Sequence, residues 1–179
     1  GVDIEGNPVE IAVNEDAATA AIVFKTVVDP FIGKLTFVKV VAGKLTADSP
    51  VINMRTGEQE RMIKMYYMCG KKQEETKCIC AGDIGAIPKL QHTNTGDTLC
   101  SPTRKVVLEG VTYPEPVLSM AILPKQKGEE DKVAQGVLRL LEEDPTLKFV
   151  NNAETHQMIL SGLGEQHLDV VVSKLKGKF

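Results

Sequence analysis

His167 is the side chain whose neighbours come closest to an acid–base arrangement, since Glu165 and Asp169 lie two positions to either side of it. The segment has a helical pattern of apolar residues, and side chains two positions apart on a helix do not face each other. No nucleophile stands in a defined relation to these three residues, and the H-E-x-x-H zinc motif is absent. We therefore expect His167 to pack against a neighbouring domain, and we expect no catalytic residue in this chain.

The four cysteines could bind a metal or form disulfides, because both reactions use the thiolate. They are Cys69, Cys78, Cys80 and Cys100, and no pair has the C-x-x-C spacing. Cys78 and Cys80 would point to the same face of a strand, and nothing in the spacing demands that His92 join them. We favour reduced thiols of a cytosolic protein and expect no metal ion. A Cys-based metal or redox module is the alternative of another class.

The glycine-containing motifs do not form a nucleotide site. Each Gly-Lys pair lacks both the upstream glycine and the following Ser or Thr of a phosphate-binding P-loop. Gly162-Leu163-Gly164 approaches the dinucleotide fingerprint, but His167 occupies the place of its third glycine. We therefore expect this chain to bind no nucleotide cofactor.

The composition limits the partners. The 179 residues carry a formal net charge of -3, with 42% hydrophobic and 25% charged residues, which is ordinary for a soluble globular protein. No apolar run approaches the roughly 20 residues of a membrane helix, and no overall basic signature for nucleic acid is present. We expect a cytoplasmic protein that contacts neither membrane nor DNA. Any contact with RNA would come from a local patch, such as Lys71 and Lys72.

Residues 19–110 contain short stretches rich in β-branched residues, separated by turn signals such as Asp48-Ser49-Pro50. Short strands punctuated in this way predict an all-β domain, a closed or nearly closed barrel. Gly70-Lys71-Lys72 is expected to open a charged loop, and residues 1–18 are interpreted as a linker because they are polar and lack periodicity. The expected strands cover residues 21–28, 34–41, 51–54, 61–68, 77–80, 83–87 and 98–100.

Residues 111–179 alternate between strand and helix patterns. Tyr113-Pro114-Glu115-Pro116 is an extended connector, because proline removes helical conformations from itself and from its predecessor. Amphipathic helices are expected at 128–143, where Asp144-Pro145 stops the pattern, and from Glu165 onward. With strands at 117–123, 147–151 and 158–161, the order is β-α-β-β-α, five of the six elements of the ferredoxin-like split βαβ fold. We expect this α+β domain to lack its last strand because the sequence is truncated.

Longer motifs in both parts add a family resemblance. In the second part they are YPEPV at 113–117, EEDPT at 142–146 and LSGLGEQHLD at 160–169. The first part contributes the runs at 24–25, 29–37, 81–86 and 95–99. In this order and spacing they resemble domains II and III of elongation factor G, the bacterial GTPase of the translocation step of protein synthesis. The resemblance covers nearly all of residues 18–179, and the joint match is highly specific.

The resemblance implies a mechanical role for this chain. The family binds GTP and Mg²⁺ in an N-terminal domain, which this sequence does not contain. The β-barrel would dock on RNA and protein of the small ribosomal subunit. The ferredoxin-like domain would pack between the barrel, the missing GTPase domain and the ribosome, with further C-terminal domains of the same chain as partners. In this way it would couple the nucleotide state of the missing GTPase domain to translocation.

The resemblance also implies site residues. The antibiotic fusidic acid wedges between domains of this family, and the matching positions are Pro114, Pro116, Asp144, Thr146 and His167. These residues are expected to face an interdomain seam.

The sequence departs from the family pattern at several positions. Gln166 and Leu163 replace the usual Leu and Met, and Lys39 stands where the barrel commonly has Arg. Cys78 and Cys80 fall where charged residues are frequent. These departures keep a divergent elongation factor G paralogue as an alternative, together with the tetracycline-resistance ribosomal protection proteins, which share the domain order.

Overall fold

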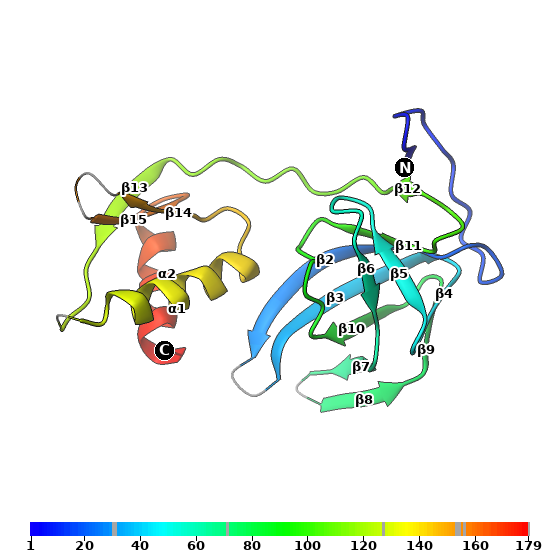
Figure 1. The fold of residues 1–179 in the computed structure, drawn as a ribbon, viewed down its shortest axis with the longest axis horizontal. Helices are drawn as coiled ribbons and strands as arrows, with labels where there is room; N and C mark the ends of the chain where they lie inside the picture. The colour runs from blue at the N-terminus through cyan, green and yellow to red at the C-terminus, as the bar shows by residue number, and fades with distance from the viewer. Residues whose placement is uncertain (30–31, 71, 127, 153–154, 156, 179) are drawn as a thin grey trace. The chain divides into compact units, whose positions relative to one another are not determined.

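The computed structural model describes residues 1–29, 32–70, 72–126, 128–152, 155 and 157–178. The chain forms two compact units, the first over residues 1–111 and the second beginning at Thr112 (Figure 1). The first unit is all-β and the second is α+β. The predicted fold class is thereby confirmed.

The first unit is built on an antiparallel eight-stranded sheet that curls into a half-barrel, with the strand order β6-β5-β11-β2-β3-β10-β7-β8 (Figure 1). Two smaller sheets, β4-β9 and β1-β12, accompany it. The strands of the large sheet are β2 Ala20–Asp29, β3 Gly33–Ala42, β5 Pro50–Asn53, β6 Gln59–Arg61, β7 Met65–Cys69, β8 Lys72–Thr76, β10 Ile84–Pro88 and β11 Thr98–Cys100. Those of the small sheets are β1 Val2–Asp3, β4 Lys44–Thr46, β9 Cys78–Cys80 and β12 Val106–Val107.

The alternation of side chains along β3 shows why this part of the sequence forms strands. Val38 and Val40 are fully buried, whereas Lys39 between them is exposed, the period of two that a strand imposes. The pairing of β2 with β3 shifts register between Val23 and Lys25, and such a bulge bends and twists its strand. The buried cluster inside the curl includes Val23, Val38, Val40, Leu45, Met62, Met65, Ile79, Ile87, Leu90 and Leu99.

Parts of the first unit differ from the sequence prediction. Lys72–Thr76 is the edge strand β8 and not a charged loop. This strand is largely exposed to solvent, so its residues are polar and lack the apolar alternation by which a strand is recognised in a sequence. The strand expected over 61–68 is split, since Met62 turns into the core with 1% exposure between β6 and β7.

Residues 1–18, expected as a linker, contact the first unit. Val2 pairs with Val107 across β1 and β12. Ile11 packs against a small apolar cluster that includes Cys100 and Val106. This segment therefore covers one end of the half-barrel.

The second unit follows the predicted order β-α-β-β-α. Its elements are β13 Leu118–Ile122, α1 Glu130–Glu143, β14 Lys148–Asn152, β15 Gln157–Gly162 and α2 Glu165–Lys178. The sheet order β13-β15-β14, with antiparallel neighbours, places β15 in the middle, as in a split βαβ unit. Within the described residues β13 pairs on one side only.

Both helices pack their predicted stripes against one face of this sheet. Val137 and Leu140 of α1 are buried, as are Leu168 and Val171 of α2, and all four join Leu160 of β15 in one cluster. Glu143 at the end of α1 is bound from α2, where the Lys178 ammonium lies 2.7 Å and that of Lys174 4.0 Å from its carboxylate. Within the described residues, no helix is long and apolar enough to cross a membrane.

Candidate functional site

Asp144 is the centre of a polar cluster at the point where α1 ends. Its backbone N–H bonds to the Leu140 carbonyl, 3.1 Å away, and its own backbone turns to an extended conformation. Its Oδ1 accepts hydrogen bonds from the Thr146 hydroxyl at 2.6 Å and the Thr146 amide at 3.0 Å. Pro145, between them, cannot continue a helix. The Asp-Pro-Thr sequence therefore both stops α1 and orients the carboxylate.

His167 joins this cluster from the first turn of α2. Its Nδ1 accepts a hydrogen bond from the Leu163 amide at 3.0 Å, and its Nε2 lies 2.9 Å from Asp144 Oδ2. Because Nδ1 must be unprotonated to accept that bond, the ring carries its proton on Nε2 and donates it to Asp144. The imidazole thus ties the end of α1 to the glycine turn that precedes α2.

The ionisation of Asp144 follows from these contacts. Burial alone would raise the pKa of its carboxyl, but the hydrogen bonds from Thr146 and His167 outweigh burial and lower the pKa below its ordinary value. A carboxylate held ionised and already accepting three hydrogen bonds is poorly suited to act as a general acid or base. The cluster is suited to fixing the geometry of a helix junction.

Gly162 is required by the close approach of His167. A Cβ at this position would lie 2.8 Å from Leu168 Cδ2 and 3.0 Å from His167 Nδ1, both shorter than ordinary van der Waals contact. The glycine therefore lets α2 begin directly against the end of β15.

The predicted seam residues do not all share one cluster. Asp144, Thr146 and His167 are brought together, although they are separated in sequence by up to 23 positions. Pro114 and Pro116 lie in the extended segment ahead of β13, where Pro114 is exposed and Pro116 is half-buried. Glu115, between the two prolines, forms an ion pair with Lys148 of β14, and both side chains are exposed.

The predicted RNA-contact pair is only partly described. Lys71 lies outside the described residues. Lys72 begins β8, its side chain is 73% exposed, and its ammonium lies 2.7 Å from Glu74 Oε1. An exposed ion pair of this kind contributes little to stability. The Lys72 ammonium can therefore leave Glu74 and pair with another anion, such as a phosphate, at a small cost in free energy.

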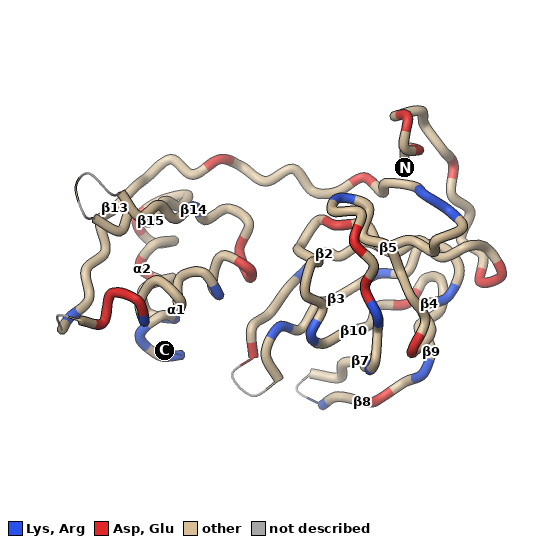
Figure 2. The backbone as a smooth tube through the Cα atoms, in the orientation of Figure 1, with Lys and Arg blue, Asp and Glu red and all other residues tan. Residues whose placement is uncertain are grey.

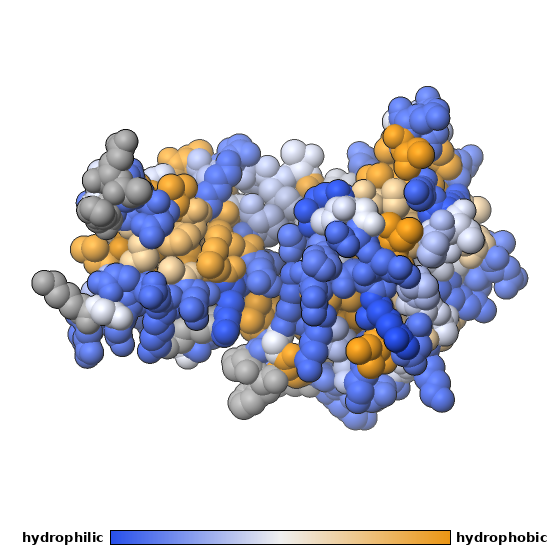
Figure 3. Space-filling model, viewed as in Figure 1, coloured by the Kyte–Doolittle hydropathy of each residue, from blue (hydrophilic) through white to orange (hydrophobic). Residues whose placement is uncertain are grey.

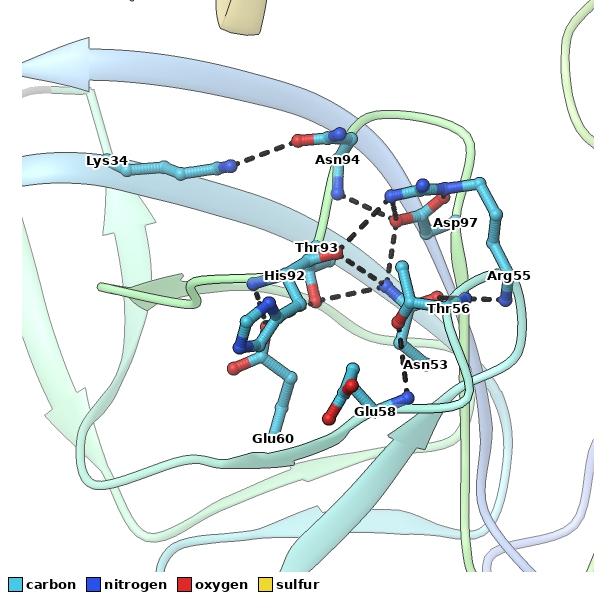
Figure 4. Close-up of polar contacts among 10 residues, drawn as sticks. All are labelled: Lys34, Asn53, Arg55, Thr56, Glu58, Glu60, His92, Thr93, Asn94 and Asp97. Carbon is cyan, nitrogen blue, oxygen red and sulfur yellow. Dashed lines mark hydrogen bonds and ion pairs between the residues drawn. The ribbon is translucent and has the colours of Figure 1, made fainter.

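A second polar cluster, which sequence reasoning missed, holds the loop between β10 and β11 (Figure 4). Asp97, whose side chain is 4% exposed, accepts hydrogen bonds from Arg55 Nε at 2.6 Å, Asn53 Nδ2 at 2.8 Å and the Asn94 amide at 2.8 Å. Burial opposes its ionisation, but these bonds prevail and the pKa of Asp97 is lowered, while the pKa of Arg55 is raised by the same contact. Asp97 lies in a turn motif visible in the sequence, whereas its partner lies 42 positions away.

Glu60 completes the second cluster from β6. It is 6% exposed, and its carboxylate accepts hydrogen bonds from the His92 amide at 2.7 Å, the Thr93 hydroxyl at 2.9 Å and the Gln91 amide at 3.3 Å. These donors come from one loop, so Glu60 fixes its backbone. No sequence signal distinguishes this residue, because a glutamate in a polar stretch is ordinarily exposed.

Neither cluster has the composition of a metal centre or of a nucleophile with its base. Among the residues that the structure describes, no group of three or more His, Cys, Asp or Glu side chains is arranged to hold a metal ion. In both clusters, hydrogen-bond donors instead surround carboxylates: the half-buried Asp144 in the first, and the buried Asp97 and Glu60 in the second. What they can do chemically is hold loops and helix ends in place.

Comparisons with known proteins identify both units. Residues 18–102 match the family model described as elongation factor G domain 2, and residues 113–179 match that of elongation factor G, domain III. A crystal structure of a protein from Thermus thermophilus is similar to this chain, with a TM-score of 0.79 and 29% sequence identity. The similarity covers 90% of this chain and 24% of the Thermus chain, so the present chain corresponds to about a quarter of that protein. Two consecutive domains of one family thus account for nearly the whole sequence, and the chain belongs to the elongation factor G family as its second and third domains.

Proposed function

We propose that this chain is the docking and coupling part of a translational GTPase, acting on the ribosome in the cytoplasm. The observation that supports the proposal is the match of its two compact units, in order, to domains 2 and III of elongation factor G. In this proposal GTP and Mg²⁺ bind in a separate GTPase domain of the parent protein. The present chain contributes a surface that binds the ribosome and a mechanical connection between the GTPase domain and the ribosome, and it contributes no catalytic group.

The second unit would transmit the nucleotide state through its helix pair. The hydrogen bonds of Asp144 to Thr146 and His167 join the C-terminus of α1 to the N-terminus of α2, and Glu143 with Lys178 joins α1 to the last turn of α2. Because α2 contacts the end of α1 through both its first and its last turn, the two helices would move as one body in this proposal. In the proposal, the seam residues Pro114, Pro116, Asp144, Thr146 and His167 lie against neighbouring domains of the parent, where a fusidic-acid-type inhibitor would bind.

The first unit would dock on RNA of the small ribosomal subunit. Basic and acidic residues are interspersed along both units (Figure 2), so attraction to phosphate must come from local lysines. Lys72 at the start of the exposed edge strand β8 is one such residue. Contacts of lysine with phosphate release counterions, and binding of this kind weakens steeply as salt increases.

Cosedimentation of the chain with purified small ribosomal subunits tests the docking proposal. We expect binding at low ionic strength that declines as salt is raised. Lys72→Glu should weaken it, whereas Lys176→Glu, an equal charge change on exposed α2, should leave it close to that of the original chain. Absence of cosedimentation with small subunits at low salt would overturn the proposal. Equal loss in the two variants would assign the effect to net charge and would overturn the role of Lys72.

A further inference from the structure

The thiols of Cys78 and Cys80 lie side by side on β9, with 3.8 Å between their Sγ atoms. Both side chains are half-buried, and Ile79 between them is fully buried in the core of the first unit. Because successive residues of a strand point to opposite faces, the burial of Ile79 turns both thiols to the other face. We call Cys78 and Cys80 the β9 thiol pair.

The backbone that carries the β9 thiol pair is held by its pairing with β4 and by the packing of Ile79. β9 pairs with β4 through the whole of its length, with Lys44 opposite Cys80 and Thr46 opposite Cys78. The side chain of Ile79 lies over Gly85, where a Cβ would come within 2.1 Å of Ile79 Cδ1. These contacts set the position of the backbone from which both thiols extend.

This geometry disfavours a disulfide. Two strand residues separated by one position have Cα atoms about 6.6 Å apart at the usual rise, near the upper limit of roughly 6.8 Å for a disulfide. The sulfur atoms would also have to close from 3.8 Å to about 2.05 Å. Such a bond would bend β9 and disturb the packing of Ile79.

The same geometry suits a tetrahedral metal ion. A zinc–thiolate bond of about 2.3 Å, taken with the tetrahedral angle, places two coordinating sulfur atoms about 3.8 Å apart. The two Sγ atoms already stand at 3.8 Å. Soft thiolate ligands also select zinc and related ions over Mg²⁺ and Ca²⁺.

The surroundings of Cys80 favour its protonated form. The hydrogen bond with Cys78 and burial raise the pKa of the Cys80 thiol, and the smaller opposing effect of the Lys44 ammonium does not cancel them. Lys44 lies across the ladder from Cys80, with its ammonium 3.1 Å from Glu15 Oε2. A bound cation removes the mutual repulsion of the two thiolates, because it attracts both of them.

We propose that Cys78 and Cys80 form a two-thiolate chelate for a tetrahedral thiophilic ion of the Zn²⁺ class, with water in the remaining positions. Each thiol releases one proton to solvent as its sulfur–metal bond forms, and no oxidant or reductant is needed. Because only two protein ligands are involved, the ion is exchangeable and is not required for folding. The site belongs to the first unit alone and does not depend on the role of the chain at the ribosome.

Titration of the reduced full chain with Co²⁺, followed by displacement with Zn²⁺, tests this proposal. We expect one equivalent of Co²⁺ to produce a thiolate-to-metal charge-transfer band, which Zn²⁺ then abolishes. Cys78→Ser and Cys80→Ser should each weaken binding at least tenfold. Cys69→Ser and Cys100→Ser, matched controls at the other two cysteines, should leave it unchanged. Absence of a band, or a band equally strong in all four variants, would overturn the proposal.

Alkylation of the unsubstituted chain gives a second readout that requires no variant to fold. With Zn²⁺ present, Cys78 and Cys80 should be protected from iodoacetamide, while the exposed Cys69 reacts as an internal control. Mass spectrometry of the peptides measures each site. Equal alkylation of Cys78 with and without Zn²⁺ would contradict metal binding. Loss of two hydrogens from the Cys78–Cys80 peptide without metal would identify a disulfide and would also overturn the proposal.

Discussion

Asp144 shows how a local sequence pattern can specify a contact between distant residues. Its oxygens accept bonds from Thr146, two positions on, and from His167, 23 positions on. The first contact follows from the Asp-Pro-Thr sequence, because short polar side chains bond to backbone groups just beyond them. The second depends on the fold, which brings the start of α2 to the end of α1.

Replacing Asp144 with alanine should destabilise the second unit by about 2 kcal/mol, because the Thr146 and His167 donors lose a charged acceptor. Asp144→Asn should cost less, since its side-chain oxygen can still accept one of the bonds. Hydrogen exchange of the buried α1 and α2 amides measures the effect within this unit. Asp169→Asn, on the exposed face of α2, is the control. Equal protection from hydrogen exchange in Asp144→Ala and the unsubstituted chain would show that the Asp144 cluster contributes nothing to the stability of the second unit.

The lowered pKa of Asp97 predicts acid sensitivity of the first unit. Its carboxyl has a lower pKa folded than the value of about 3.9 expected unfolded. Its stabilising contribution is therefore complete above that value and is lost as pH falls through the folded pKa. We expect Asp97→Asn to unfold at a lower temperature near neutral pH and to lose less stability on acidification.

Thermal unfolding followed by circular dichroism at several pH values measures this difference. Asp48→Asn is the matched control, because the Asp48 side chain is 66% exposed and pairs with Arg61 only at the surface. Parallel pH profiles for Asp97→Asn and the unsubstituted chain would rule out a contribution from the Asp97 carboxylate.

At the level of elements, sequence patterns predicted the second unit more completely than the first. The apolar stripes of α1 and α2 repeat at helical spacing, and Leu140 and Leu168 are buried as expected. In contrast, β8 was missed because Lys72, Glu74 and Glu75 give it no apolar alternation. An edge strand gains its order from pairing with its neighbour, and that partner is not visible in its own sequence.

The junction between β15 and α2 makes a specific prediction for Gly162. Gly162→Ala should destabilise the second unit by about 1–3 kcal/mol, because its Cβ would overlap Leu168 and His167. Gly164→Ala is a close control, since a Cβ there has no atom within 4 Å. Urea denaturation compares the two. A larger loss for Gly164→Ala than for Gly162→Ala would contradict the packing argument.

At the level of the whole molecule, the order of motifs in the sequence predicted the family because the joint pattern is far more specific than any one part. The hydrogen bonds and ion pairs that join separate motifs could not be predicted from the order of the motifs. Arg55 with Asp97, and Glu60 with His92, connect positions whose proximity only the folded barrel reveals.

The two units together should neither bind nor hydrolyse GTP. Neither polar cluster offers a phosphate-binding loop, and the carboxylates of Asp97, Glu60 and Asp144 already accept hydrogen bonds from neighbouring protein groups. Isothermal calorimetry of the chain with GTP and Mg²⁺ should show no heat of binding at micromolar nucleotide. Saturable binding in that range would contradict this assignment.

The edge strand β8 of the first unit and the edge strand β13 of the second unit differ in how well their side chains protect them from pairing with another molecule. The outer strand β8 carries Lys72, Glu74 and Glu75, and charges on an edge discourage pairing with another molecule. The open side of β13 carries no such charges. Val117, Met120 and Leu123, in and beside this strand, are 81%, 46% and 78% exposed. Apolar residues also gather on the visible face of this unit (Figure 3). Concentrated solutions of the chain should therefore begin to aggregate through β13, and a single lysine at Met120 would be enough to slow precipitation.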